Sequence, residues 1–232
     1  MIFTQKPKHV QILVLLLFAS CFGVCDAGTI VGKVKAEGKA EAQQDISSGK
    51  YESRKWKFVE RLNYGEFKDF VVYIDQPIPG SLPPTEPLQV IIQKNAVFVP
   101  HILPVMVGTT VEWPNHDDIF HNVFSMSEPK SFDLGLYKSN ETKRVTFDKP
   151  GRVDVFCSIH TKMNCIVLVL QSPFFSVTDE KGFYKISNVP PGRYKLTGWH
   201  ERMPLVTKEI EVPATGEVKA DLTLTISGLP KY

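Results

Sequence analysis

Short apolar runs, separated by loops that contain Pro, Gly, Asn or Asp, make up most of the chain after residue 28. Runs of this length that are rich in Val, Ile, Phe and Tyr and bounded by such loops predict β-strands. The predicted strands cover residues 29–36, 69–75, 88–92, 96–99, 103–108, 109–113, 121–125, 143–147, 151–157, 164–170, 174–178, 182–186, 193–199, 207–212 and 218–226. The pattern therefore predicts an all-β protein.

One stretch, residues 37–68, has a pattern that fits two kinds of structure. It is polar and basic, and Tyr51, Phe58 and Leu62 would share one face of a helix. The alternation of polar and apolar residues at 55–58 would instead fit a strand. Periodicity does not decide between them, so both readings stay open.

The first 27 residues of the 232-residue chain predict an export signal. Lys6 and Lys8 precede a mostly apolar stretch at 10–24, which is too short for a membrane span, and small residues follow near Ala27. An uncleaved anchor, a buried helix and a lipoprotein form attached through Cys21 are the alternatives. We expect a periplasmic or otherwise exported protein without an integral membrane span. The net charge of +2 does not suggest a nucleic-acid partner.

Removing the signal leaves two cysteines, Cys157 and Cys165. In an oxidising compartment, two cysteines commonly form a disulfide, which here would join the strands on either side of one loop. The alternative is that Cys157 is a metal ligand and Cys165 is a small buried residue at the start of a strand.

The segment from Cys157 to Met163 favours the metal ligand. Alternation in the preceding strand puts Val153, Val155 and Cys157 on one face, while His160 and Met163 lie on the loop that follows. With His121 from an upstream strand, the set would be two His, one Cys and a weak axial Met. Such a set is typical of copper electron-transfer sites, because thiolate and thioether favour Cu(I) and imidazole suits copper in general.

The spacing Cys-x-x-His-x-x-Met resembles the ligand loop of amicyanin-type cupredoxins, the blue (type 1) copper proteins. The stretch at 108–115, followed by His121-Asn122-Val123, also resembles that family. The resemblance covers residues 88–171 and implies a Greek-key sandwich with one copper per chain. The ligands that it implies are His121, Cys157, His160 and Met163. It also implies that Asn122 ties the strand of His121 to the Cys157 loop.

The function implied is that of an electron carrier, not an enzyme, which exchanges single electrons with a redox protein through Cu(II) and Cu(I). A copper-storage or delivery protein without redox turnover is the alternative. An enzyme of the nitrite reductase kind would need a second metal site, and a purely structural sandwich would bind no metal. His116 is the main rival to His121 as a ligand, although its polar loop suggests a solvated side chain. His101 has no ligand partner nearby in sequence, and His200 is expected at the end of a strand.

The C-terminal part resembles a second β-sandwich, the carboxypeptidase regulatory-like (transthyretin-like) domain. The resemblance rests on residues 178–183 and 191–194. Its opening strands would lie before the cupredoxin segment, so we expect the cupredoxin to be inserted into a discontinuous sandwich. The expected division is a signal at 1–27, early strands with a basic insert at 28–87, the cupredoxin at 88–171 and the rest of the sandwich at 172–232. The alternative is a separate C-terminal domain beside a cupredoxin that owns residues 28–172.

Overall fold

The computed structural model describes residues 27–38, 64–79 and 88–225. The regular structure in these ranges is β-strand, apart from the short 3-10 helix η2 (Tyr64–Glu66). The prediction of an all-β protein is therefore confirmed. The expected signal at 1–27 and the undecided stretch at 37–68 lie mostly outside the described residues. Within the described ranges, no helix has the length and apolar character needed to cross a membrane.

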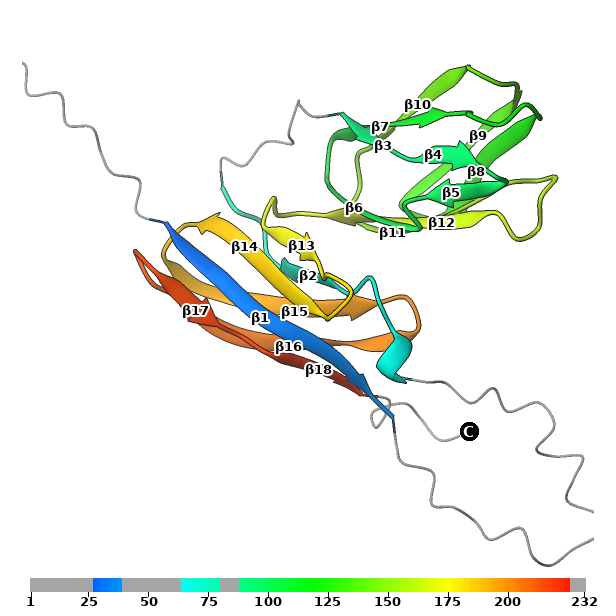
Figure 1. Cartoon of the computed structure of the whole chain (residues 1–232). Coiled ribbons are helices and arrows are strands. Elements are labelled where there is room, and N and C mark those ends of the chain that lie inside the picture. Colours follow the sequence, from blue (N-terminus) through cyan, green and yellow to red (C-terminus); the bar gives the residue numbers. More distant parts are fainter. Residues whose placement is uncertain (1–26, 39–63, 80–87, 226–232) are drawn as a thin grey trace, which may run out of the picture.

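The first and last strands of the described chain form two facing sheets, which we call the terminal sandwich (Figure 1). In one sheet, β1 (Gly28–Glu37) runs antiparallel to β14 (Phe183–Val189) and parallel to β17 (Glu217–Lys219) and β18 (Leu222–Thr225). The other sheet has, in spatial order, β13 (Phe175–Val177), β2 (Val71–Ile74), β15 (Gly192–His200) and β16 (Met203–Val212).

All four residues of β2 are buried, which explains its unbroken apolar sequence. Val72 and Ile74 belong to the core between the two sheets of the terminal sandwich. Val71 and Tyr73 point the other way and pack in a separate apolar cluster with Leu168. Both faces of the strand are thus covered, as a strand without polar alternation requires.

The strands between residues 89 and 170 form a second pair of sheets, the central sandwich (Figure 1). The smaller sheet has the order β10 (Thr142–Phe147), β7 (Thr109–Pro114) and β3 (Gln89–Val90). The larger sheet has the order β6 (Ile102–Met106), β12 (Asn164–Leu170), β11 (Gly151–Phe156), β8 (His121–Ser127) and β9 (Lys130–Tyr137). A two-residue turn joins the hairpin of β4 (Ile92–Lys94) and β5 (Val97–Val99).

The core of the central sandwich lies between its two sheets. Trp113 and Phe147 contribute from the smaller sheet and are fully buried. Val153, Val155 and Cys157 contribute from the β11 side of the larger sheet, as their alternation predicts. The thiol of Cys157 therefore points into the sandwich at the end of its strand.

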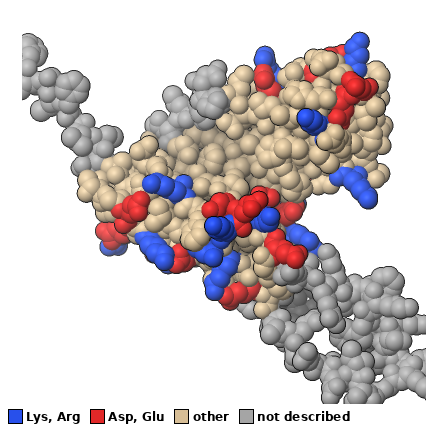
Figure 2. Space-filling view, viewed as in Figure 1, with Lys and Arg blue, Asp and Glu red and all other residues tan. Residues whose placement is uncertain are grey.

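A third apolar cluster joins the two sandwiches. It packs the outer face of β2 and β15 against the outer face of β6 and β12. Its buried members are Val71, Tyr73, Ile102, Ile166, Leu168, Leu170 and Trp199. Figure 2 shows the central sandwich as a broad, mostly uncharged surface with charges near its edges, and the terminal sandwich as a mixture of both signs.

The chain leaves the terminal sandwich and returns to it at adjacent positions. Residue 75 follows β2 directly, and β13 pairs with β2 in the register Phe175 to Tyr73. The N–H of Ile74 also donates to the carbonyl of Phe174 at 3.0 Å. The proline-rich stretch 77–87, which follows β2 in the chain, lies partly outside the described residues.

Two strand predictions were wrong in detail, and one strand, β9, was not predicted. In β9 the alternation of burial breaks at Gly135, which has φ of 65°, so that Leu136 is exposed and Tyr137 is buried. The run at 88–92 is divided into β3 and β4 by the buried Ile91. The run at 218–226 is interrupted at Ala220, whose carbonyl passes so close to Gly32 that a Cβ there would lie 2.1 Å away.

Candidate metal centre

The loop between β11 and β12 begins at Cys157 and carries three of the four expected ligands. Two main-chain hydrogen bonds close it: the N–H of Cys157 donates to the carbonyl of Met163 at 3.1 Å, and the N–H of Met163 donates to the carbonyl of His160 at 2.9 Å. Cys157 and Met163 are buried, and His160 is partly exposed. The tight loop therefore presents a buried thiol and a partly exposed imidazole at one end of the central sandwich.

His121, the first residue of β8, meets this loop. Its Nδ1 atom lies 3.1 Å from Nδ1 of His160, and that nitrogen lies 3.7 Å from Sγ of Cys157. The donor atoms of His121, Cys157 and His160 all lie within 4.8 Å of one another. Residues separated by 36 positions in sequence thus converge as a His-Cys-His group.

Asp117 contacts the imidazole of His121, a role that the sequence patterns did not predict. Its Oδ2 atom lies 2.8 Å from Nε2 of His121. The same carboxylate accepts the N–H groups of Asn95 at 2.6 Å and Ala96 at 2.8 Å. These two residues have φ of 57° and 55° and form the turn between β4 and β5, so their N–H groups converge on one acceptor.

The hydrogen bonds to Asp117 determine its charge and the tautomer of His121. Burial acts to raise the pKa of Asp117, but the hydrogen bonds from Ala96, His121 and Asn95 outweigh it and leave the pKa lowered. A carboxylate only accepts hydrogen bonds, so Nε2 of His121 carries the hydrogen. In the neutral ring, Nδ1 then has a free lone pair directed at Cys157 and His160.

Asn122 links the strand of His121 to the loop, which confirms the expectation for this residue. Its N–H lies 3.5 Å from Sγ of Cys157, and its Oδ1 accepts the N–H of Ser158 at 3.3 Å. Its Nδ2 donates to Oδ1 of Asp133 at 2.7 Å. Hydrogen bonds from Gly135 and Asn122 lower the pKa of Asp133, which therefore holds the Asn122 amide as a charged acceptor.

The two cysteines are free thiols in the structure, so the alternative of a disulfide receives no support from it. Cys165 is buried in β12, opposite Val155, and burial raises the pKa of its thiol well above the ordinary value. Cys165 is thus a small apolar member of the core, whereas Cys157 opens into the His-Cys-His group.

The other histidines of the described ranges lie apart from this group. His116 is exposed on the loop before His121. His101 contacts Asn164 and Glu201, and His200 is buried against Phe67, with ring centroids 4.7 Å apart. Among the described residues, His121 and His160 are the histidines that approach Cys157.

Large apolar side chains are exposed on the loop from Cys157 to Met163 and on the residues before β8. Ile119, Phe120 and Ile159 are each about half exposed, with values of 48%, 54% and 51%. Pro104 does not belong to this patch. It lies buried in the middle of β6, opposite Leu168.

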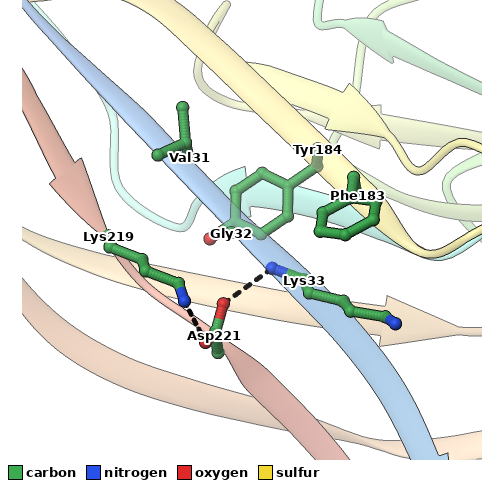
Figure 3. A pocket seen from close by; sticks show the side chains of 7 residues that line it. All are labelled: Val31, Gly32, Lys33, Phe183, Tyr184, Lys219 and Asp221. Carbon is green, nitrogen blue, oxygen red and sulfur yellow. Dashed lines mark hydrogen bonds and ion pairs between the residues drawn. The ribbon is translucent and has the colours of Figure 1, made fainter.

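A pocket of about 280 Å³ lies elsewhere, on the terminal sandwich (Figure 3). Its lining residues are Val31, Gly32, Lys33, Phe183, Tyr184, Lys219 and Asp221. Asp221 accepts the N–H of Lys33 at 2.9 Å and pairs with Nζ of Lys219 at 3.2 Å. Since the carboxylate is already engaged within the protein, we assign no ligand to this pocket.

Comparison with known proteins adds one similarity of sequence. The chain is 34% identical over 68 residues to amicyanin-alpha from Methylorubrum extorquens. This match covers 28% of the chain and 57% of amicyanin-alpha. Part of the chain is therefore similar in sequence to an amicyanin. No protein-family model matches it.

Solved cupredoxin structures also match part of the chain. A purple cupredoxin from Nitrosopumilus maritimus is 27% identical, with a TM-score of 0.33, and the match covers 35% of this chain and 98% of that one. A copper-containing nitrite reductase from Thermus scotoductus is 31% identical, with a TM-score of 0.35. That match covers 42% of this chain and 26% of the reductase.

Proposed function

We propose that the protein is an exported copper protein that carries single electrons between redox partners. The observation that carries the proposal is the convergence of His121, Cys157 and His160 within 4.8 Å. Met163 would supply the weak axial ligand, because it closes the same short loop and is buried beside the group. The cupredoxin relationship supports the same reading.

The donor atoms fit a copper ion by their chemistry. Asp117 leaves the Nδ1 lone pair of His121 facing Nδ1 of His160, at a separation of 3.1 Å. Two nitrogen lone pairs at that distance repel unless a proton or a cation lies between them. A thiol beside two imidazoles is also a soft and borderline donor set, which suits copper better than magnesium or calcium.

A bound copper ion would supply one-electron exchange between Cu(II) and Cu(I). The protein's own contribution is to hold the ligands still. The main-chain bonds of the loop, the Asp117–His121 contact and the Asn122–Ser158 contact all fix donors in place without the metal. A prearranged site changes little between the two oxidation states, which favours rapid electron exchange over binding and release of copper.

The partner would be another redox protein that docks over His160. Ile119, Phe120 and Ile159 offer it an apolar surface at that end of the central sandwich. Export is part of the proposal and rests on the sequence of residues 1–27. The resemblance of the terminal sandwich to carboxypeptidase regulatory-like domains stays a prediction.

Copper binding and colour test this function. The mature protein should bind one copper per chain, show an intense thiolate-to-copper absorption band when oxidised, and reduce reversibly in cyclic voltammetry. Reversible reduction with retained metal supports an electron carrier. A protein that binds Cu(I) but is colourless, and passes copper to a chelator or partner, would instead be a delivery protein. A chain without stoichiometric copper would contradict the whole proposal.

We further propose that the central sandwich is a domain inserted into the terminal one. The pairing of β1 with β14, and of β2 with β13 and β15, supports this arrangement, because the partners lie on opposite sides of residues 88–171. The adjacent positions of Ile74 and Phe174 support it too, because an insertion leaves and rejoins its host at neighbouring points.

A further inference from the structure

A polar contact at the edge of the apolar layer joins the two sandwiches. Nε2 of His101, just before β6, lies 3.1 Å from Oε2 of Glu201, in the turn between β15 and β16. The main-chain carbonyl of Glu201 accepts a hydrogen bond from Nη1 of Arg152 at 3.2 Å. The side chains of His101 and Glu201 keep 39% and 28% exposure, so the pair is accessible to solvent protons.

The second ring nitrogen of His101 reaches the end of the metal-ligating loop. Its Nδ1 lies 3.2 Å from the carbonyl oxygen of Asn164, the residue after Met163. The main-chain carbonyl of His101 accepts the N–H of Ile166 at 2.8 Å, which holds the histidine against the first residues of strand β12. His101 thus lies between the terminal sandwich and the loop.

Both partners of the imidazole are acceptors, and this fact constrains its charge. A carboxylate and a main-chain carbonyl have no hydrogen to donate. The ring can bond to both at once only when both of its nitrogens carry hydrogen, that is, as the imidazolium. The neutral ring has a single N–H, so it must give up the contact with either Glu201 or Asn164.

We propose that His101, held between Glu201 and Asn164, is a positioning residue that ties the metal-ligating loop to the terminal sandwich. The proposal rests on the function proposed above, because the loop matters through Met163 and His160. It gives the terminal sandwich a role in the copper site, and it makes the tie dependent on pH. The tie is complete when His101 is protonated and loses one of its two bonds when the ring is neutral.

The other titratable or charged groups near His101 contact other partners or are buried. Nη2 of Arg152 is paired with Asp154 at 2.7 Å, and the guanidinium lies 5.9 Å from the ring centroid of Trp199. Arg202 lies over the ring of Phe67. His200 is buried, and burial is the main cause that lowers its pKa, so it is uncharged at neutral pH. Glu201 is therefore the anion that faces the His101 ring.

Two variants and one control test the tie. Glu201→Gln keeps the size of the side chain, but its amide also pairs with a neutral ring, so it removes the requirement for the imidazolium. His101→Gln can no longer change its charge. Glu211→Gln removes the acid of a comparable exposed pair with Arg193 in the same sandwich, and serves as the control.

The first measurement uses the copper-free protein, so that it does not depend on the proposed function. Ring ¹⁵N shifts of His101 in the wild type and in Glu211→Gln identify the pH range in which both of its nitrogens carry hydrogen. Amide exchange at 163–166 should accelerate on deprotonation by roughly two- to fivefold beyond the intrinsic change, as expected for a half-exposed pair. This excess should vanish in His101→Gln and shrink in Glu201→Gln.

The second measurement follows the reduction potential of the copper-loaded protein over the same pH range. The pH dependence should be reduced in His101→Gln and Glu201→Gln and retained in Glu211→Gln. The proposal is overturned if amide exchange at 163–166, or the reduction potential, depends on pH equally in all three variants. If the copper-free results are as expected but no copper binds, the tie stands and the electron-carrier function fails.

Discussion

Nε2 of His121 lies 2.8 Å from Oδ2 of Asp117, four residues earlier in the chain. This contact turns Nδ1 of His121 towards His160 and Cys157 before any metal is present. Asp117 is itself held by the N–H groups of Asn95 and Ala96, so the hairpin of β4 and β5 takes part in orienting the candidate ligand. The geometry of the centre thus depends on residues well outside the Cys157 loop.

Replacing Asp117 by Asn should weaken copper binding. The amide keeps an acceptor but loses the negative charge that favours a metal-bound imidazole, and such changes typically cost about 10- to 100-fold in metal affinity. A competition titration against a copper chelator measures the loss. Asp118→Asn, at the exposed neighbouring position, is the control. Equal affinities in the two variants would mean that Asp117 does not support the metal.

Replacing Cys157 by Ser should abolish the thiolate-to-copper absorption band, whereas Cys165→Ser should leave it nearly intact. Cys157 lies 3.7 Å from Nδ1 of His160, and Cys165 is buried in β12 as a free thiol. Absorption and EPR spectra of the two copper-loaded variants provide the comparison. Loss of the band in both would point to a joint role for the two cysteines.

The grouping of His121, Cys157 and His160 could be predicted because these residues lie within a short loop and at the start of one strand, where spacing and alternation carry the information. The role of Asp117 could not be predicted, because it depends on the positive φ of Asn95 and Ala96, which lie 22 and 21 residues earlier in a hairpin. The contact between His101 and Glu201 joins residues 100 positions apart in different sandwiches. Sequence patterns of period two do not record such tertiary contacts.

Replacing Met163 by Gln should keep copper bound but lower the reduction potential. An axial ligand tunes the potential more than it holds the metal, and an amide oxygen favours Cu(II) over Cu(I) compared with a thioether. Cyclic voltammetry of the variant and the wild type at one pH measures the shift. Met126→Gln, at a surface position that is 84% exposed, is the control. An unchanged potential in Met163→Gln would show that Met163 is not the axial ligand.

His200 should make the protein less stable as the pH falls below neutrality. Burial is the main cause that lowers its pKa in the folded state, so the unfolded chain takes up a proton first. The contribution of His200 to the free energy of unfolding is therefore complete above the pKa of about 6.5 that a histidine has in the unfolded chain. It is lost as the pH falls from there to the pKa of His200 in the folded state. Urea unfolding at pH 7.5 and pH 5 measures the difference.

In His200→Phe, which retains an aromatic ring next to Phe67, this part of the acid destabilisation should disappear. His116→Gln removes an exposed histidine and should leave it unchanged. His200→Phe loses the acceptor for the N–H of Arg202, so the comparison concerns the change of stability with pH and not the absolute stability. An unaltered pH dependence in His200→Phe would assign the acid sensitivity to other groups.

The proposed insertion predicts that the two sandwiches can be destabilised separately. Val72 and Val153 are both fully buried, the first in the core of the terminal sandwich and the second in that of the central one. Replacing either by Ala removes two buried carbons and leaves a cavity, at a cost of about 1.5–3 kcal/mol. Hydrogen exchange resolved along the chain then shows which strands lose protection.

Val72→Ala should weaken β1, β14 and β15 and leave the copper band unchanged, and Val153→Ala should weaken β7, β8 and β12. Because the third apolar cluster couples the sandwiches through β2 and β12, some loss across it is expected in both variants. An equal loss throughout the chain in both would show one cooperative unit and contradict the insertion.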